Sequence, residues 1–195
     1  MPATATLNAG ECSDLAGPYR LAESPDLGAR ALGTEMAQYA GNEESHETAC
    51  GVADALGSVL ANSYMLMTTT QACHWNGTGA GLFGLDKLTE DQFTELFHAI
   101  DAIADRLCEI GGHAPASLAG MFAHATVFDA DGAGEPCGSH AAARMLAEAH
   151  EAVAVVALQA ATLAEHEADQ TTHGMLVTRV AAHEKAARLL RSHLA

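Results

Sequence analysis

The sequence predicts an all-α protein, a four-helix bundle with a long connection between its second and third helices. Four long stretches carry apolar residues at the three-to-four spacing of a helix face. Alanine, leucine, glutamate and methionine, which favour helices, are frequent, whereas valine, isoleucine and threonine are too scattered to indicate a sheet. A chain of 195 residues suits one ordinary domain with a sizeable core.

The composition of residues 1–43 predicts an N-terminal extension, which is followed by a helical domain over 44–195. They contain Gly, Pro, Ala and Ser without a sustained period, and their basic residues are Arg20 and Arg30. Residues 1–30 lack the basic start and apolar stretch of a signal peptide. No apolar run reaches the roughly 18 residues of a membrane span, so no contact with a membrane is expected.

The first two helices are predicted over about Ser45 to Asn76 and about Thr89 to Ile110. Closely spaced glycines end the first helix, and Gly111 with Gly112 ends the second. The residues expected to face inward are Val52, Leu56, Val59, Leu60 and Met67 in the first helix, and Phe93, Leu96, Phe97, Ile100, Ile103, Leu107 and Ile110 in the second.

Residues 113–138 predict a loop-like crossover with a short helix over about Ala116 to Ala125, capped near Ser117. Asp129 to Gly132 resembles the start of a calcium loop, but the remaining ligand spacing is absent and a plain turn is expected. The last two helices are predicted over about Ser139 to Glu167 and Thr171 to His193. Their expected inward residues are Met145, Leu146, Ala149, Val153, Val156 and Leu163, then Leu176, Val180, Ala187 and Leu190.

The formal charge of −16, with Lys87 and Lys185 as the two lysines, describes a surface that repels DNA phosphates and anionic lipid and attracts cations. An acidic or salt-adapted protein without any such role explains the net charge equally well. The five cysteines are odd in number and form no Cys-x-x-Cys pair, so free thiols in a reducing cytoplasm are expected. Cys73 and Cys108 suit small buried apolar positions.

The stretch from residue 74 to residue 105 holds the candidate metal ligands. Asp86 and Glu90 are four residues apart, and so are two later acids, so each pair shares one helix face. Carboxylates around one imidazole suit Fe(II), Mn(II) or Zn(II), whereas a structural zinc site would use more cysteine. On spacing alone, such acids are more often a solvated face. The candidate ligands are His74, Asp86, Glu90, Asp101 and Asp105.

The same stretch resembles the motif of the Dps-type mini-ferritins, a branch of the ferritin-like superfamily. The matching residues begin with His74-Trp75-Asn76 and continue without a gap through Gly79, Leu85, Lys87-Leu88, 91–96, Ala99-Ile100-Asp101 and Arg106. The resemblance extends through 110–118, His150-Glu151-Ala152 and His183-Glu184-Lys185, and so covers about 46–195.

What this resemblance implies is a dodecameric cage that oxidises and stores iron. Ferroxidase sites would lie at two-fold interfaces, consume peroxide or oxygen together with Fe(II), and so protect against oxidative damage. One half-site would be His74 with Asp101 and Asp105 of the neighbouring subunit, and the other would be Asp86 with Glu90. Iron would be the metal, with Zn²⁺ or Mn²⁺ suited to the same site.

Three of these five positions depart from the family pattern. Asp86 stands where the family has histidine, Glu90 where it has aspartate, and Asp105 where it has glutamate. The last two changes are reciprocal, so facing donors would shift together and still meet a metal. The first adds a negative charge and moves the preference toward harder ions. The alternative is a relaxed site in a cage that sequesters metal without fast oxidation.

The remaining candidates have structural alternatives. Glu95-x-x-His98 has the spacing of an intra-bundle ferritin site, but the last helix lacks a second such pair, so His98 is expected at the surface or toward a partner. Trp75 either takes up oxidising equivalents or only packs. A cluster at the last helix turn would either line a pore, as the family implies, or be solvated: His166, Glu167, Asp169 and His173. A DNA-compacting role would need lysine-rich tails that the chain lacks, so DNA binding is not expected.

Overall fold

The computed structural model describes residues 43–128 and 138–194, with side chains from residue 51 onward. All five elements in these ranges are helices, as predicted. The predicted extension over 1–43 and the turn at 129–132 lie almost wholly outside the described residues, so both stay predictions. The helices are α1 (Glu43–Asn76), α2 (Leu82–Glu109), α3 (Leu118–His124), α4 (Ser139–His166) and α5 (Gln170–His193).

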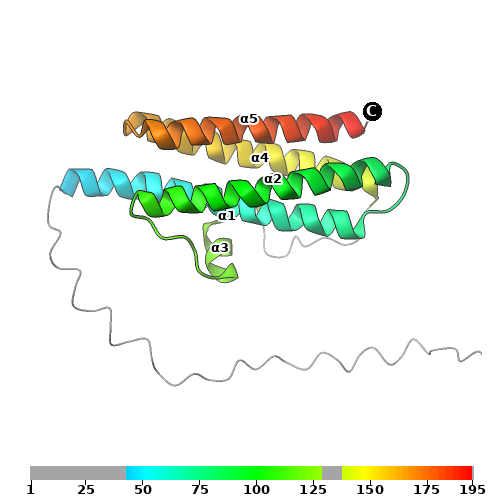
Figure 1. Cartoon of the computed structure of the whole chain (residues 1–195), viewed down its shortest axis with the longest axis horizontal. Coiled ribbons are helices and arrows are strands. Elements are labelled where there is room, and N and C mark those ends of the chain that lie inside the picture. The colour runs from blue at the N-terminus through cyan, green and yellow to red at the C-terminus, as the bar shows by residue number, and fades with distance from the viewer. Residues whose placement is uncertain (1–42, 129–137, 195) are drawn as a thin grey trace, which may run out of the picture. The chain divides into compact units, whose positions relative to one another are not determined.

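The four long helices form a bundle with a long crossover (Figure 1). α1 runs antiparallel to α2, and α4 runs antiparallel to α5, whereas α2 and α4 run in the same direction. The connection from α2 to α4 must therefore return along the bundle, and it carries α3, which packs on α1. Ser117 caps α3 as predicted, because its hydroxyl accepts the backbone N–H of Gly120 at 3.1 Å.

α2 begins seven residues earlier than the sequence pattern predicted, at Leu82 and not at Thr89. Gly81 precedes it with φ of 80°, a left-handed conformation that glycine adopts at little cost. The glycine-rich turn is therefore shorter than expected, and the helix starts directly after it. This correction places Asp86 and Glu90 in the second and third turns of α2, with the rigidity of a helix interior.

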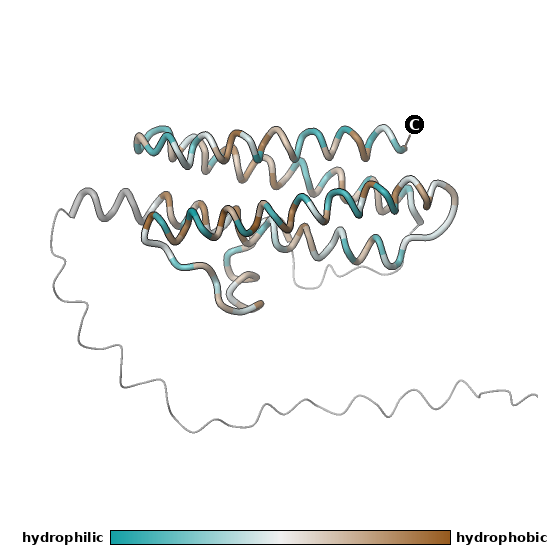
Figure 2. Tube along the Cα trace, viewed as in Figure 1, coloured by the Kyte–Doolittle hydropathy of each residue, from teal (hydrophilic) through white to brown (hydrophobic). Residues whose placement is uncertain are grey.

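The bundle core contains most of the predicted inward residues, and each described helix mixes hydrophobic and hydrophilic positions (Figure 2). Three expectations were wrong. Phe97 is 57% exposed and Met145 is 36% exposed, because both lie beside the buried stripe of their helices and not within it. Cys73 is buried as expected, but Cys108 is exposed. The fully buried large residues from the predicted stripes are Leu56, Val59, Leu60, Leu96, Ile103, Leu146, Leu176 and Leu190.

α4 is the one described helix whose length and apolar composition would suit a membrane span. Twelve of its residues are buried in the bundle, and most of these are alanines. Small side chains allow α4 to lie close to its neighbours, so the core position of the helix accounts for its composition.

Polar contacts fix the positions of α2 and α5 relative to each other. At the end of α2, Arg106 donates to both carboxylate oxygens of Asp169 at 2.9 and 3.0 Å and to the hydroxyl of Thr172 at 2.9 Å. Asp169 also caps α5 by accepting the backbone N–H of Thr172 at 3.0 Å. Further along, Arg179 forms a bidentate pair with Glu95. Such paired, partly buried contacts fix the register between helices more strongly than exposed pairs do.

A pair of buried histidines joins α4 to α5. The Nδ1 atoms of His150 and His183 lie 3.0 Å apart, and each residue is 1% exposed. One Nδ1 must donate and the other accept, so the accepting ring at least must be neutral. Burial lowers the pKa of His150 to about 4, and the positive charge of Arg179 adds to the effect while Glu95 opposes it. Burial, then Arg179 and His150, lower the pKa of His183 to about 2.

The histidine pair predicts a loss of stability in acid. Both folded-state pKa values lie below the ordinary value of 6.5, so the unfolded chain binds protons first. Stability should be complete above pH 6.5 and fall between pH 6.5 and about 4 by roughly 1 kcal/mol per pH unit for each histidine. Urea unfolding followed by circular dichroism across this range measures the effect.

The control for this prediction replaces both partners by apolar residues. A His150→Leu, His183→Leu variant should lose less stability over the same pH range, because no buried imidazole remains to be protonated. Replacing the exposed His124 and His166 by glutamine should leave the pH dependence as it is. An acid-stability slope that is equal in all three proteins would contradict this account of the pair.

Candidate metal centre on the outer face of α2

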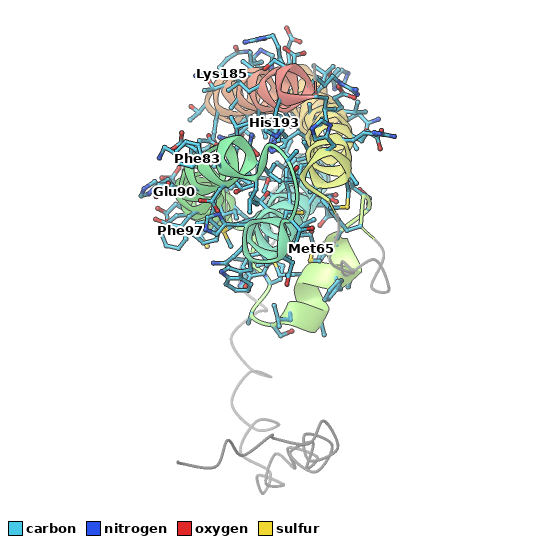
Figure 3. The ribbon with its side chains drawn as sticks, turned by 90° about the vertical axis from the view of Figure 1, so that its right-hand side faces the viewer. Met65, Phe83, Glu90, Phe97, Lys185 and His193 are labelled. Carbon is cyan, nitrogen blue, oxygen red and sulfur yellow. The ribbon has the colours of Figure 1, made fainter. Side chains whose placement is uncertain are left out.

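One outward-facing stripe of α2 carries all four predicted carboxylate ligands. Their positions, and those of two phenylalanines, recur at intervals of three, four and seven residues, which places them on one side of the helix. Figure 3 shows the labelled side chains of Phe83, Glu90 and Phe97 pointing away from the bundle on this side. We call this stripe the α2 face; it comprises Phe83, Asp86, Glu90, Phe97, Asp101 and Asp105.

His74 lies beside the first part of the α2 face, at the end of α1. Its Nδ1 is 3.1 Å from an Asp86 carboxylate oxygen and 3.1 Å from the Thr89 hydroxyl oxygen. The Thr89 hydroxyl is buried and gives its own hydrogen to the backbone carbonyls of Leu85 and Asp86, each at 2.9 Å. It must therefore accept a hydrogen bond from the imidazole.

These two contacts determine which ring nitrogen of His74 can bind a metal. Because Thr89 and Asp86 both present oxygen atoms to Nδ1, the hydrogen belongs on Nδ1 and the lone pair on Nε2. A metal-binding histidine is usually oriented in this way, with its second ring nitrogen donating to an oxygen atom. The side chain of His74 is 34% exposed, so the ring remains accessible from solvent.

Lys87 forms ion pairs with two neighbouring carboxylates. Its amino group lies 2.9 Å from a carboxylate oxygen of Glu90 and 2.9 Å from one of Asp91. The hydrogen bonds to Glu90 and then to Asp91 raise the pKa of Lys87 to about 12, so it is charged at any physiological pH. A cation that binds Glu90 must compete with this ammonium group.

Asp101 and Asp105 are both exposed and lie much further along α2 than Asp86, the residue that His74 contacts. Asp86 and Asp101 are 15 positions apart in the sequence, which at 1.5 Å per residue separates them by about 22 Å along the helix axis. Donors to one ion lie within about 4 Å of one another. Among the described residues, accordingly, no three histidine, cysteine or acidic side chains lie close enough together to hold a metal.

The structure thus brings together His74 and Asp86 only. Glu90 lies one turn further along α2, and the two later aspartates lie further still. Trp75 is 70% exposed and packs little within this chain. His98 is exposed as expected and lies edge-on to Phe97, with ring centroids 5.7 Å apart. Since Glu95 is paired with Arg179, Glu95 and His98 do not form an intra-bundle site.

The predicted cluster at the α4–α5 turn divides into separate roles. His166 lies 3.0 Å from Glu167 at the surface, while His173 approaches the backbone oxygen of Ala161 at 3.1 Å. Asp169 is engaged by Arg106, as described above. Pore lining by these residues stays a prediction.

Thr89 and Lys87 are the contacts that sequence reasoning missed. Lys87 precedes Glu90 by three residues and Asp91 by four, the spacing of ion pairs on a helix. The sequence pattern did not predict these pairs, because it placed Lys87 before the start of the helix. The contact between Thr89 and His74 joins two helices, so no local sequence pattern predicts it.

Comparison with known proteins agrees with the fold. A family model described as a ferritin-like domain matches residues 53–195. An uncharacterized low temperature-induced protein of Nostoc is 30% identical over 145 residues, which is 74% of this chain; the chain spans about 61% of that relative's length. A DNA protection during starvation protein of Brevibacillus brevis is 35% identical over 81 residues, 42% of this chain and 54% of the relative.

Solved structures resemble the described fold closely. A crystal structure of a Dps protein from Bacillus brevis matches with a TM-score of 0.70 and 28% identity, covering 76% of this chain and 98% of that one. A Dps protein from Vibrio cholerae, described as a member of a broad superfamily of ferritin-like diiron-carboxylate proteins, matches with a TM-score of 0.71 over 76% of this chain and 92% of that one. At 21% identity, the latter supports the fold alone.

The arrangement around His74 predicts one tautomer. Neutron diffraction from deuterated crystals should show deuterium on Nδ1 of His74 and none on Nε2. A Thr89→Val variant should weaken this preference, since only Asp86 then accepts from Nδ1. A Thr94→Val variant, at an exposed position of the same helix, should leave it unchanged. Deuterium on Nε2 in the unmodified protein would refute the assignment.

Proposed function

Because the chain belongs to the ferritin-like family and is a Dps-type mini-ferritin, we propose that it stores iron in a cage of identical subunits. We further propose that Fe(II) is oxidised at sites shared between two subunits, each of which supplies part of the ligand set. Iron is here the substrate and cargo of the cage. The proposal includes a dodecamer, as the resemblance to the family implies.

The single observation that carries the shared site is the division of donors along α2. His74, Asp86 and Glu90 lie near one end of the α2 face, and Asp101 and Asp105 lie further along it, at a distance that no common ion spans. Two copies whose α2 faces meet in antiparallel orientation would bring the first group of one chain to the second group of the other. Neither group alone has enough donors for a redox site.

The composition of the α2 face favours such contact between copies. Phe83 is 88% exposed and Phe97 is 57% exposed in the single chain, and both lie among the carboxylates. Large aromatic side chains on a surface are typical of protein–protein interfaces, where their burial provides most of the stabilisation. Their burial between two α2 faces would also exclude water from the metal site between them.

The donors fit iron chemically. Four carboxylates stabilise the additional positive charge as Fe(II) becomes Fe(III), and one imidazole completes the set. His74 would bind through Nε2, because Nδ1 is held by Thr89 and Asp86. Asp86 therefore has a second role beside that of a ligand: it orients His74. The family histidine at that position would not accept from Nδ1 with the same strength, so this departure adds a positioning contact.

The proposed reaction consumes peroxide without releasing radicals. Two Fe(II) ions give one electron each to hydrogen peroxide, the O–O bond breaks, and two protons complete two water molecules. Oxygen would serve as a slower oxidant. Because both electrons are delivered together, hydroxyl radical formation is suppressed. The ferric product then nucleates as mineral on carboxylates inside the cage, and Zn²⁺ or Mn²⁺, which suit the same donors, would compete with Fe(II).

A second candidate function is metal sequestration without fast oxidation. The observation that favours it is Lys87, whose ammonium group holds Glu90 at 2.9 Å and lowers the charge available to a metal. In that case the cage would take up Fe(II) but form ferric product slowly. DNA protection, which appears in the name of a relative, is disfavoured here by the net charge of −16.

The central test is the rate of iron oxidation. After Fe(II) and peroxide are mixed with the protein in a stopped-flow instrument, ferric absorbance should rise quickly. An Asp101→Ala, Asp105→Ala variant should slow this rise by at least about tenfold, because each interface site loses two ligands. A Glu184→Ala variant, at an exposed acid of α5, is the matched control and should keep the original rate.

The outcome of this experiment also separates the two candidate functions. Slow ferric product from the unmodified protein, with Fe(II) nevertheless bound, would establish sequestration in place of oxidation. An unchanged fast rate in the double aspartate variant would remove Asp101 and Asp105 from the site.

The contact between Lys87 and Glu90 predicts a gain of affinity on removal of the lysine. A Lys87→Gln variant should bind Fe(II) roughly two- to five-fold more tightly, because Fe(II) no longer has to displace the Lys87 ammonium group from Glu90. The difference should shrink at high salt. Lys185→Gln changes the net charge equally at a distant exposed position, so it is the control. Equal half-saturating Fe(II) concentrations for the two variants would show that Lys87 does not compete with the metal.

A further inference from the structure

A second pair of metal-ligating side chains lies away from the α2 face, at the end of the bundle where α4 begins and α5 ends. His140 is in the first turn of α4, and His193 is the last residue of α5. Their ring centroids are 6.0 Å apart, with an angle of 57° between the ring planes. We infer that His140 and His193 form a binding site for a borderline divalent transition metal of the Zn²⁺, Ni²⁺ or Cu²⁺ class.

The outer nitrogens of both rings border one small space above Gly81. A Cβ atom at Gly81 would lie 3.1 Å from Nε2 of His193 and 3.7 Å from Nε2 of His140. The space exists because residue 81 has no side chain. A Cβ at Gly84 would lie 3.0 Å from both Nδ1 and Cε1 of His193, so a second glycine makes room for the ring itself.

His193 has an unused buried nitrogen at this point. Its Nε2 is shielded from solvent and has no hydrogen-bond partner within the described part of the chain. A buried ring nitrogen without a partner is costly, and coordination of a metal ion would satisfy it. Figure 3 labels His193 at this end of the bundle.

The backbone around the space is held in place by hydrogen bonds. The N–H of Ser139 donates to the carbonyl of Thr78 at 2.8 Å, and the Ser139 hydroxyl donates to the carbonyl of Ala80. Gly84 donates to the carbonyl of Gly81 at 3.1 Å. These contacts tie the start of α4, which carries His140, to the turn that borders the space. The backbone that carries His140 is therefore fixed relative to the glycine turn.

The chemistry of the two side chains favours a cation with an affinity for imidazole. The helix dipoles contribute little, because His193 lies at the C-terminal end of α5, which attracts a cation, and His140 lies in the first turn of α4, which repels one. Neutral imidazole suits Zn²⁺, Ni²⁺ and Cu²⁺ better than the harder Mg²⁺ or Ca²⁺. With two protein ligands, water would fill the remaining coordination positions, which describes an exchangeable site and not a structural one.

Equilibrium dialysis of the full chain against Zn²⁺ tests the inference. The comparison uses four proteins in an Asp101→Asn, Asp105→Asn background, which removes the two aspartates of the proposed oxidation site: the background protein itself and its His140→Gln, His193→Gln and His124→Gln derivatives. His124 is an exposed histidine of α3, so its replacement is the matched control. The background and His124→Gln proteins should each retain one Zn²⁺ per chain more than the other two.

A crystal soaked in Zn²⁺ shows where the bound zinc lies. An anomalous peak within about 2.1 Å of both Nε2 atoms would support the site. Equal zinc content in all four proteins, or a peak at His193 that persists unchanged in the His140→Gln variant, would overturn it. Because the background lacks two of the proposed iron ligands, a failure here leaves the iron-oxidation proposal standing, and the converse also holds. Circular dichroism at pH 7 confirms that each variant is folded.

Discussion

The proposed shared site depends on the fixed rise of the α-helix. One straight helix carries two pairs of acids on the same face, and the rise of 1.5 Å per residue keeps those pairs about 20 Å apart. No rotation of side chains closes such a distance. If the acids bind one ion, the second pair must come from another copy of the chain. The metal site is then complete only when two subunits associate. A lone subunit would then hold only fragments of a site.

The rest of the bundle can be understood as support for that helix. Arg106 fixes the end of α2 to the start of α5, and Glu95 fixes its middle through Arg179. On the opposite side, α4 and α5 are joined by the neutral His150–His183 pair and by the bidentate contact of Arg191 with Glu151, both distances 2.7 Å. These contacts leave α2 little freedom to bend or slide. The outward ligands therefore keep the spacing on which a two-copy site depends.

The sequence predicted much of the fold because helix periodicity is local. The ends of α1, α4 and α5 were predicted to within about two residues, and the crossover with its short helix followed from the spacing of breakers. The start of α2 was wrong because Gly77, Gly79 and Gly81 resemble a long loop, whereas a single left-handed glycine is enough to begin the helix. Phe97 was misplaced because an aromatic beside the core stripe looks apolar in any pattern, whether it faces the core or a partner.

The candidate site was predictable only in part, for a related reason. Its ligands could be named from a motif, but their orientation depends on contacts between helices. The hydrogen bonds of His74 with Thr89 and Asp86 cross from α1 to α2, and the burial of the two histidines depends on α4 and α5 together. Such pairings require the three-dimensional register, which no short spacing rule contains. The reciprocal change at positions 90 and 105 is equally hard to interpret from the sequence. Its effect on metal binding depends on which carboxylates face each other across two chains.

The most direct measurement is a crystal structure of the assembled protein soaked anaerobically in Fe(II), with anomalous data collected at the iron edge. We expect iron between two subunits, bonded to Nε2 of His74 from one chain and to Asp101 of the other. Iron coordinated entirely within one chain, or subunits packed with their α2 faces apart, would contradict it.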